Sequence, residues 1–257
     1  MKENLISIIV PVYNAAPFLY RMLDSICCQT YKQWELILLD DASTDNSLEI
    51  LQQWKQTWER KIDNEIILIS HTKNQGPAAT RNEGIRLAKG RYLAYLDADD
   101  YWEKEKLEKQ WKFMKKTGCI FSFTGYEFAN KNGMKTGKVV YAPEKLTYQD
   151  ALKNTIISTI TVMFDRGQIS ESLLLMPEDS KREDTATWWN ILREGYVAYG
   201  IKEPLSVYCR HRGSHSANKL KAVYGTWQLY RKQERLSLFD TLRYMSGYLH
   251  SAISRRL

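Results

Sequence analysis

The chain has 257 residues, 44% of them hydrophobic, which is enough for a buried core in one large domain or one domain with an appendage. Its net charge of +7 is uneven, because residues 210–257 carry ten Lys and Arg against two acidic residues and leave a charge of −1 for residues 1–209. No apolar run approaches ~18 residues, which excludes a spanning helix, and the start of the chain has no signal-peptide pattern. The four cysteines lack the spacing of a disulfide framework or a zinc site, so we expect reduced thiols and a cytoplasmic protein.

The first hundred residues alternate between predicted strands and predicted helices. The apolar runs predict strands over 5–10, 34–39, 65–70 and 91–96, and helical spacing predicts helices over 17–29, 47–60 and 78–88. We expect Ser43 or Asp45 to cap the second helix and Gly90 to end the third. This alternation predicts an α/β fold with a doubly wound, mostly parallel central sheet.

A polar cluster follows each of these predicted strands. The clusters are Pro11–Asn14, Asp40–Asp45, Asn74–Gly76 and Asp97–Asp100. In a parallel sheet the four loops lie along one edge, where open α/β sheets bind ligands. Neither the glycine fingerprint of dinucleotide folds nor a P-loop is present, so phosphates would be held by a metal and by side chains.

The last of these clusters has the clearest chemistry. The apolar run Tyr92–Leu96 ends in Asp97, Asp99 and Asp100. Carboxylates two residues apart do not easily stay ionised together in a cleft without a cation between them. The sequence therefore predicts a Mg²⁺ or Mn²⁺ site shared with a diphosphate. The alternative is that Asp100 caps a helix over 102–116.

The second half of the chain changes character. We expect a helix over 104–116, a strand over 120–128, a hairpin over 130–141, a helix over 146–154 and a strand over 156–164. Asp165 or Arg166 is expected to open a further helix. The remaining chemical signals are the acidic pair Glu183–Asp184, followed by Trp188 and Trp189, and a basic loop over 208–219.

These motifs, in this order and spacing, resemble those of glycosyltransferase family 2. The resemblance covers residues 5 to about 110 in full and continues at Glu183–Asp184. It implies the GT-A fold and inverting transfer from a nucleotide-sugar donor. We expect a GT-A domain over 1–215, with a nucleotide-sugar-binding half over 1–100 and an acceptor-binding half over 101–215, followed by a basic amphipathic tail over 216–257.

The resemblance also implies roles for single residues. Asp184 would be the general base with Glu183 in support, and Asp99 would bind the metal. Asp41 would hold the nucleobase. The residues implied at the nucleotide-sugar site are Pro11, Tyr13, Asp41, Asn74, Gly76, Arg81, Asp97, Ala98 and Arg210. Trp188 or Trp189 would stack on the acceptor sugar, unless both belong to the core.

The basic loop departs from the family pattern. Cys209 stands where an Arg usually follows the Tyr, and Arg210 comes one place later. The sequence therefore leaves open which of Arg210, His211 and Arg212 reaches the diphosphate. A cationic loop that closes over a diphosphate is the functional interpretation, and a solvated basic loop is the alternative.

The sequence of the tail predicts an interfacial helix over 235–253. Its apolar residues at helical spacing are Leu238, Leu242, Met245, Leu249 and Ile253, with Phe239 and Tyr248 beside them. Aromatic and basic residues precede it, as is typical of segments that bind an anionic membrane surface. The alternative is that this stripe packs against the sheet.

The expected activity is inverting, metal-dependent transfer of a hexose, glucose or galactose, from a UDP-sugar. The expected acceptor is a GlcNAc- or GalNAc-diphosphate-polyprenyl intermediate of bacterial O-antigen or capsule synthesis. The enzyme would lie peripherally on the inner face of the cell membrane and would not bind nucleic acid. Two alternatives stay open: a sugar-nucleotide nucleotidyltransferase, and a basic nucleic-acid-binding module suggested by the sequence pI of about 9.1.

Overall fold

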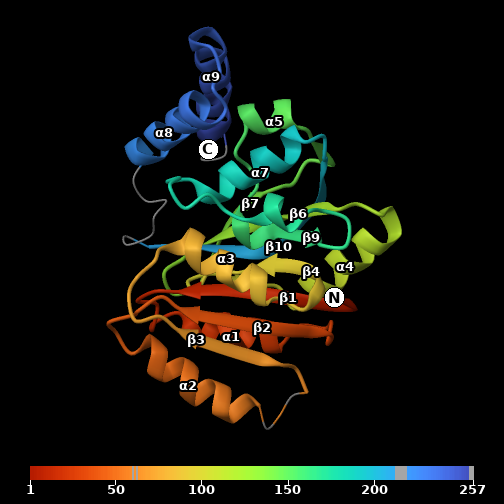
Figure 1. Cartoon of the computed structure of the whole chain (residues 1–257), viewed down its shortest axis with the longest axis vertical. Coiled ribbons are helices and arrows are strands. Elements are labelled where there is room, and N and C mark those ends of the chain that lie inside the picture. The colour runs from red at the N-terminus through yellow and green to blue at the C-terminus, as the bar shows by residue number, and fades with distance from the viewer. Residues whose placement is uncertain (60, 62, 212–218, 255–257) are drawn as a thin grey trace.

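The computed structural model describes residues 1–59, 61, 63–211 and 219–254. Helices lie against a large central sheet, and the helices of the C-terminal segment project from one end of the molecule (Figure 1). The predicted class is confirmed: this is an α/β chain with one large sheet and a C-terminal helical extension.

The first four strands follow the prediction closely. They are β1 (Lys2–Val12), β2 (Trp34–Asp40), β3 (Ile66–Ser70) and β4 (Gly90–Tyr95), and they pair in parallel in the order β3-β2-β1-β4. The connecting helices are α1 (Leu19–Cys27), α2 (Ser47–Trp58) and α3 (Pro77–Leu87). The apolar side chains of α3 pack on one face of the sheet and those of α1 and α2 on the other, which explains why the strands read as continuous apolar runs.

Beyond β4 the sheet is mixed rather than mostly parallel. Strand β9 (Val162–Asp165) lies antiparallel between β4 and β6 (Phe121–Asn130), and β10 (Ala198–Arg210) runs parallel to β6. Short strands complete the edges: β5 (Tyr101–Trp102), β7 (Lys135–Val140) and β8 (Lys145–Leu146). The sequence did not predict β10, because Lys202, Glu203 and Pro204 interrupt its apolar pattern and the register against β6 shifts there.

The helices of the second half are α4 (Lys106–Thr117), α5 (Tyr148–Lys153), α6 (Glu171–Leu174), α7 (Glu183–Arg193), α8 (Lys219–Gln228) and α9 (Leu238–Ser254). A 3₁₀ turn over Thr159–Thr161 precedes β9, so the strand expected over 156–164 is shorter than predicted. A π-helical turn over Leu229–Gln233 follows α8.

The predicted roles of Gly90 and Asp165 at helix ends are wrong, and the alternative role of Asp100 as a helix cap is excluded. Gly90 does not end α3 but opens β4, where a Cβ would lie 2.5 Å from the carbonyl oxygen of Leu5. Asp100 does not cap a helix, because α4 begins only at Lys106. Asp165 opens no helix, since its two oxygens accept hydrogen bonds from the Arg91 guanidinium at 2.8 and 2.9 Å.

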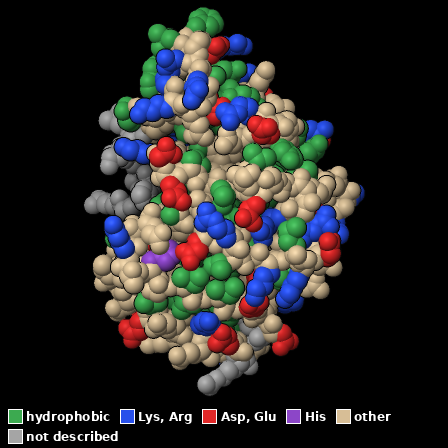
Figure 2. Space-filling view, viewed as in Figure 1, with side chains coloured by type: hydrophobic (Ala, Val, Ile, Leu, Met, Phe, Trp, Pro, Cys, Tyr) green, Lys and Arg blue, Asp and Glu red, His purple; other side chains and the backbone are tan. Residues whose placement is uncertain are grey.

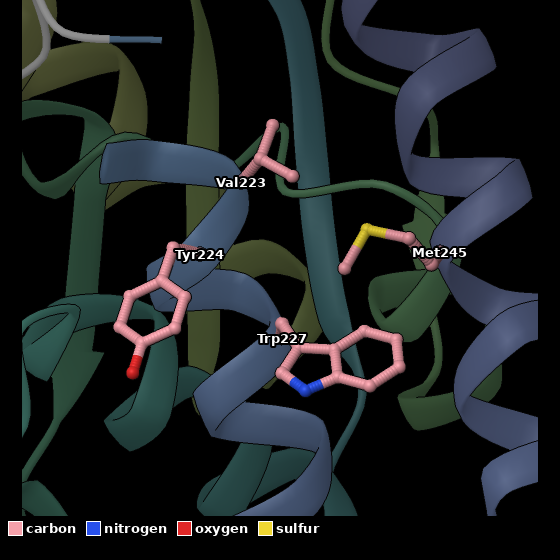
Figure 3. Close-up of a pocket in the computed structure, with 4 residues that line it drawn as sticks. All are labelled: Val223, Tyr224, Trp227 and Met245. Atoms are coloured by element: carbon pink, nitrogen blue, oxygen red, sulfur yellow. The ribbon is translucent and has the colours of Figure 1, made fainter. Parts of the chain in front are cut away.

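The central sheet takes strands from residues 2 to 210, so both expected halves of the domain share one sheet. The tail packs on the second half: α9 lies against α5, and Tyr230 stacks on Trp189 at 5.2 Å between ring centroids. Val223, Tyr224 and Trp227 of α8 and Met245 of α9 line a groove of about 380 Å³, in which the Tyr224 ring points away from Met245 (Figure 3). No described helix is long and apolar enough to cross a membrane.

Candidate active site

The loops at the carboxyl end of β1 and β2 hold one another. The side-chain oxygen of Asn14 accepts the backbone N–H of Thr44 at 2.7 Å, and the Asn14 N–H donates to Ser43 Oγ at 3.0 Å. Asn14 has a positive φ of 50°, a conformation that Asn tolerates better than most residues. Of the two residues expected to line a base pocket here, Tyr13 is exposed and Pro11 is half-buried.

Asp41 lies at the centre of the expected nucleoside pocket. Its buried carboxylate accepts the backbone N–H groups of Gln75 at 2.9 Å and Gly76 at 2.8 Å. Asn74 donates its amide to the backbone carbonyl of Asp41 at 3.2 Å. Gly76 has a φ of 87° and precedes Pro77, the first residue of α3, so glycine is favoured at this turn. The structure thus brings Asp41, Asn74 and Gly76 together.

The acidic cluster follows β4. Burial raises the pKa of Asp97, and the charge of Asp99 raises it further. Burial, then Asp99 and Asp97, raise the pKa of Asp100 well above its ordinary value. Asp100 accepts the backbone N–H of Cys209 at 2.6 Å, which fastens the cluster to β10. Ala98, which lies between Asp97 and Asp99 in the chain, is buried, so only its backbone can reach a ligand.

A histidine lies directly against the predicted metal ligand. His211 Nε2 is 2.8 Å from Asp99 Oδ2, and its ring stacks on Phe18 at 4.8 Å between centroids. Within the described residues no three His, Cys, Asp or Glu side chains form a metal centre. Asp99 and His211 nevertheless offer two ligand atoms of the types that bind divalent metals, and the like-charge repulsion among the aspartates favours a cation there.

The structure describes two of the three residues of the basic loop that were candidates for the diphosphate, Arg210 and His211. Arg210, at the end of β10, places its guanidinium 3.7 Å from the ring centroid of Phe128. Arg212 and the rest of the loop over 212–218 lie outside the described residues. Of the two described members of this trio, His211 contacts the acidic cluster through Asp99.

Arg81 of α3 joins the acidic cluster to the predicted catalytic pair. Its Nη2 donates to Asp97 Oδ1 at 2.7 Å and its Nη1 donates to Glu183 Oε1 at 2.9 Å. Although burial alone would lower it, Asp97 and Glu183 raise the pKa of Arg81. Arg81 as a whole residue is only 6% exposed. The two carboxylates therefore hold a buried cation between them.

Glu183 and Asp184 lie in the first turn of α7, where the helix dipole stabilises negative charge. Burial, and then the neighbouring Asp184, raise the pKa of Glu183. Asp184 accepts Thr159 Oγ1 at 3.1 Å and the backbone N–H of Thr185 at 2.6 Å. The Glu183 carboxylate is thus paired with Arg81, whereas the hydrogen bonds that Asp184 accepts come from hydroxyl and backbone donors.

Asn82, the neighbour of Arg81 on α3, positions the same region. Its amide donates to the backbone carbonyl of Met176 at 2.8 Å and accepts the Met176 N–H at 2.7 Å. Arg81 and Asn82 together therefore tie α3 to the segment that leads into α7. The signal for this role was the Arg–Asn pair itself, since side chains of this kind on a buried helix require partners.

The predicted stacking of a tryptophan on the acceptor sugar is wrong. Trp188 is 2% exposed and Trp189 is 1% exposed. Trp188 packs among Phe121, Phe164 and Tyr95, and Trp189 stacks on Tyr230. Both indoles belong to the core, as the alternative interpretation held, because Trp188 faces the sheet and Trp189 faces the C-terminal segment.

The acidic cluster after β4 and the carboxylate pair of α7 therefore meet through Arg81 at the carboxyl edge of the parallel strands, where open α/β sheets bind ligands. Residues 7–168 match the family model described as "Glycosyl transferase family 2". The chain belongs to this family and is an enzyme of the glycosyltransferase class.

Named relatives are consistent with this assignment. The chain is 43% identical over 255 residues to the putative teichuronic acid biosynthesis glycosyltransferase TuaG of Bacillus subtilis, covering 99% of this chain and 98% of TuaG. It is 37% identical over 220 residues to WfaP of Escherichia coli, a UDP-Glc:alpha-D-GlcNAc-diphosphoundecaprenol beta-1,3-glucosyltransferase, covering 86% of this chain and 83% of WfaP. Among solved structures, the mannosyltransferase PcManGT of Pyrobaculum calidifontis, in complex with GDP-Man and Mn²⁺, superposes with a TM-score of 0.73 at 23% identity, covering 95% of this chain and 69% of PcManGT.

Proposed function

We propose that the chain transfers glucose from UDP-glucose to a GlcNAc-diphosphate-polyprenol and inverts the anomeric centre. The observation that carries this proposal is the Arg81 bridge, which joins the acidic cluster to the Glu183–Asp184 pair within one site. The name of the relative WfaP supports the donor and the acceptor class. Family membership favours this reaction over the nucleotidyltransferase alternative.

The donor would bind along the carboxyl edge of β1, β2 and β4. Asp41 would accept from the base, with Pro11, Tyr13, Asn74 and Gly76 around it. The sugar-diphosphate side would meet Asp97, the backbone of Ala98, and the cations Arg81 and Arg210. Arg81 would support this region by holding Asp97 and Glu183 in place, because these two carboxylates already balance the charge of its guanidinium.

Asp99 and His211 would hold a divalent cation, Mn²⁺ or Mg²⁺. Their donor set supports this fit, since a carboxylate oxygen and an imidazole nitrogen lie 2.8 Å apart beside two further carboxylates. An imidazole ligand favours Mn²⁺ over Mg²⁺, which prefers oxygen. When bound, the cation would supply positive charge against the leaving diphosphate.

Asp184 would act as the general base. An acceptor hydroxyl is a weak nucleophile near neutral pH, so a carboxylate must take its proton as the anomeric carbon is attacked. Glu183 would orient Asp184 through Arg81 and the first turn of α7. Attack from the face opposite the nucleotide would convert the α-linked donor into a β-linked product.

The tail would bring the enzyme to its lipid-linked acceptor on the inner face of the cell membrane. Helix α9 buries Met245 and Tyr248 but leaves other apolar side chains exposed. We define the tail surface as these apolar residues together with the exposed cations around them: Leu238, Phe239, Leu242, Leu249, Arg231, Lys232, Arg235 and Arg243. Green and blue side chains are interspersed at this end of the molecule (Figure 2). Such a mixture suits an anionic membrane surface.

A donor screen tests the proposal. The purified chain is incubated with a synthetic GlcNAc-diphosphate-lipid and UDP-glucose, UDP-galactose or UDP-GlcNAc, in Mn²⁺, in Mg²⁺ and in EDTA. We expect UDP release and a new lipid-linked disaccharide with UDP-glucose, abolished by EDTA. Turnover of UDP-galactose instead would correct the sugar, and full activity in EDTA would contradict the metal assignment.

A further inference from the structure

A histidine that no motif singled out lies beneath the expected nucleobase site. His71 directly follows β3, and its side chain is 6% exposed. Its Nδ1 is 2.8 Å from Asp41 Oδ1 and its Nε2 is 2.7 Å from Glu83 Oε2. The imidazole therefore bridges the carboxylate of the β2–α2 loop to helix α3.

The contacts of Asp41 determine which acceptor positions stay open. An ionised carboxylate offers about four of them, two on each oxygen. Oδ1 receives both the Gln75 N–H and the His71 ring, while Oδ2 receives the Gly76 N–H. This pattern fills Oδ1 and leaves a second position on Oδ2. A uracil ring presents one imide N–H between two carbonyl groups, so it needs one acceptor in a fixed direction.

We propose that His71 is a positioning residue for nucleobase recognition, which fixes Asp41 so that Oδ2 presents its open acceptor position to the imide N–H of a uracil ring. The inference rests on the proposed function, because the role of Asp41 toward the base belongs to it. His71 acts through Asp41 and makes no contact of its own with the donor.

The bridge depends on the protonation of the imidazole. The cation donates through both ring nitrogens, whereas neutral imidazole donates through only one. Burial opposes the charged form, but the hydrogen bonds that the ring donates to Asp41 and Glu83 outweigh burial and raise the pKa of His71 above its ordinary value. The bridge is therefore complete below pH ~6.5 and is lost as the pH rises through the raised pKa.

The two ends of the bridge are not equivalent. Asp41 and Glu83 are the charged groups that face His71, and their side chains are 4% and 37% exposed. When the imidazole becomes neutral, Glu83 can turn toward water while Asp41 cannot. His71 then stays bound to Asp41 but loses its anchor on α3, so the direction of the Asp41 carboxylate is less well fixed.

The test is UDP binding by isothermal titration calorimetry between pH 6 and 9. For the wild-type chain we expect the Kd to rise by roughly tenfold over this range, the size of one hydrogen bond to a charged group. His71→Gln should bind as weakly at pH 6 as the wild type does at pH 9, and its Kd should not depend on pH. With saturating UDP-glucose its kcat should stay within about twofold of wild type, because the chemistry is remote.

Glu83→Gln provides the discriminating variant. It keeps the hydrogen bond to Nε2 but removes a negative charge, so it should lower the pKa of His71 and move the rise in Kd to lower pH. The pKa itself is measured by NMR of histidine-labelled protein, in which the chain has four His to assign. His250→Gln, an exposed histidine on α9, is the matched control and should leave the profile unchanged.

A purely structural role for His71 predicts something different. Variants would then lose thermal stability with the same Kd and the same pH profile as wild type, and that result would overturn the inference while leaving the proposed function intact. If Glu83→Gln leaves both the His71 pKa and the Kd profile unchanged, the bridge has no role in binding. Failure of the wild-type chain to bind UDP at any pH would instead overturn the proposed function.

Discussion

Arg81 is the residue on which the geometry of the site depends most. It is buried between Asp97 and Glu183, and removing one of its two donors leaves a carboxylate without its partner. Arg81→Lys can satisfy only one carboxylate, because an ammonium does not reproduce the guanidinium fork. We expect a loss of about 2 kcal/mol in the free energy of unfolding, less than for fully buried pairs because Asp97 and Glu183 are partly exposed.

Urea denaturation measures this loss. Arg86→Lys is the control, since Arg86 lies on the exposed face of the same helix and its replacement should be neutral. Equal stability of Arg81→Lys and wild type would show that the bridge does not hold the two halves of the site together.

Asp184 and Glu183 are adjacent but differ in their partners. Asp184→Asn keeps the size and the ability to accept Thr159 but cannot take a proton. We expect kcat to fall by roughly 10²–10⁴ while donor binding changes little. Steady-state kinetics with separate titration of donor and acceptor measures both. Near wild-type kcat would move the base to another group, and Glu183→Gln would be examined next.

Helix α4 contains an unusual buried lysine. Lys106 is fully buried, its Nζ has no hydrogen-bond partner, and it lies 4.0 Å from the ring centroid of Trp102. Burial lowers the pKa of Lys106 well below its ordinary value. The folded chain thus binds fewer protons than the unfolded chain between the lowered pKa and pH ~10.5, so this group makes stability rise with pH across that interval.

Lys106→Met should therefore stabilise the chain by about 1 kcal/mol or more near pH 7. This gain should shrink as the pH approaches the ordinary pKa of a lysine side chain. Urea unfolding at several pH values measures the difference. Lys109→Met, one turn away, removes exposed ion pairs with Glu105 and Glu203 and should give no gain. A destabilised Lys106→Met would mean that contact of the ammonium with Trp102 outweighs its burial.

The sequence predicts helices and strands well where a single pattern, such as a buried apolar run, decides the element. The alternation from β1 to β4 and the rim of polar loops follow from buried apolar runs and parallel topology. Strand β10 was missed because Pro204 and two charged residues interrupt it, and its stability comes from pairing with β6. The role of the tryptophans of α7 was predicted wrongly. Their position in the chain, close to the Glu183–Asp184 pair, does not show whether their side chains point toward the site or into the core.

The sequence predicted the motifs of the site separately, but it did not predict the contacts that join them. No local pattern indicates that Arg81 reaches Glu183, a residue 102 positions away. His71 was missed for a similar reason, since it acquires its partners from other elements. His211 was predicted as a candidate for the diphosphate, but its contact with Asp99 was not predicted. A rule that counts the first polar residue after every strand would have included His71.

At the scale of the whole molecule, the tail surface provides a testable interface. Each Lys or Arg near an anionic leaflet contributes on the order of 1 kcal/mol, and Phe239 and Leu242 would insert beside them. The wild-type chain should co-sediment with anionic but not zwitterionic vesicles, and salt should weaken the binding. The double variant Phe239→Ser, Leu242→Ser should bind several-fold more weakly, as expected from lost apolar burial.

Met134→Ser is the control for that experiment, because Met134 is also exposed but lies in the β6–β7 hairpin. Both variants should keep the wild-type unfolding midpoint, since none of these side chains packs in the core. If the wild-type chain ignores anionic vesicles at low salt, the tail serves only the packing of α5 and α7.

The configuration of the product tests the central claim most directly. The wild-type chain is given UDP-glucose and the GlcNAc-diphosphate-lipid, and the disaccharide is analysed by proton NMR for its anomeric coupling and its linkage. Attack assisted by Asp184 from the face opposite the diphosphate predicts a β-linked glucose, which Asp184→Asn should form roughly 10²–10⁴ times more slowly. An α-linked product would contradict single displacement at this site and the role assigned to Asp184.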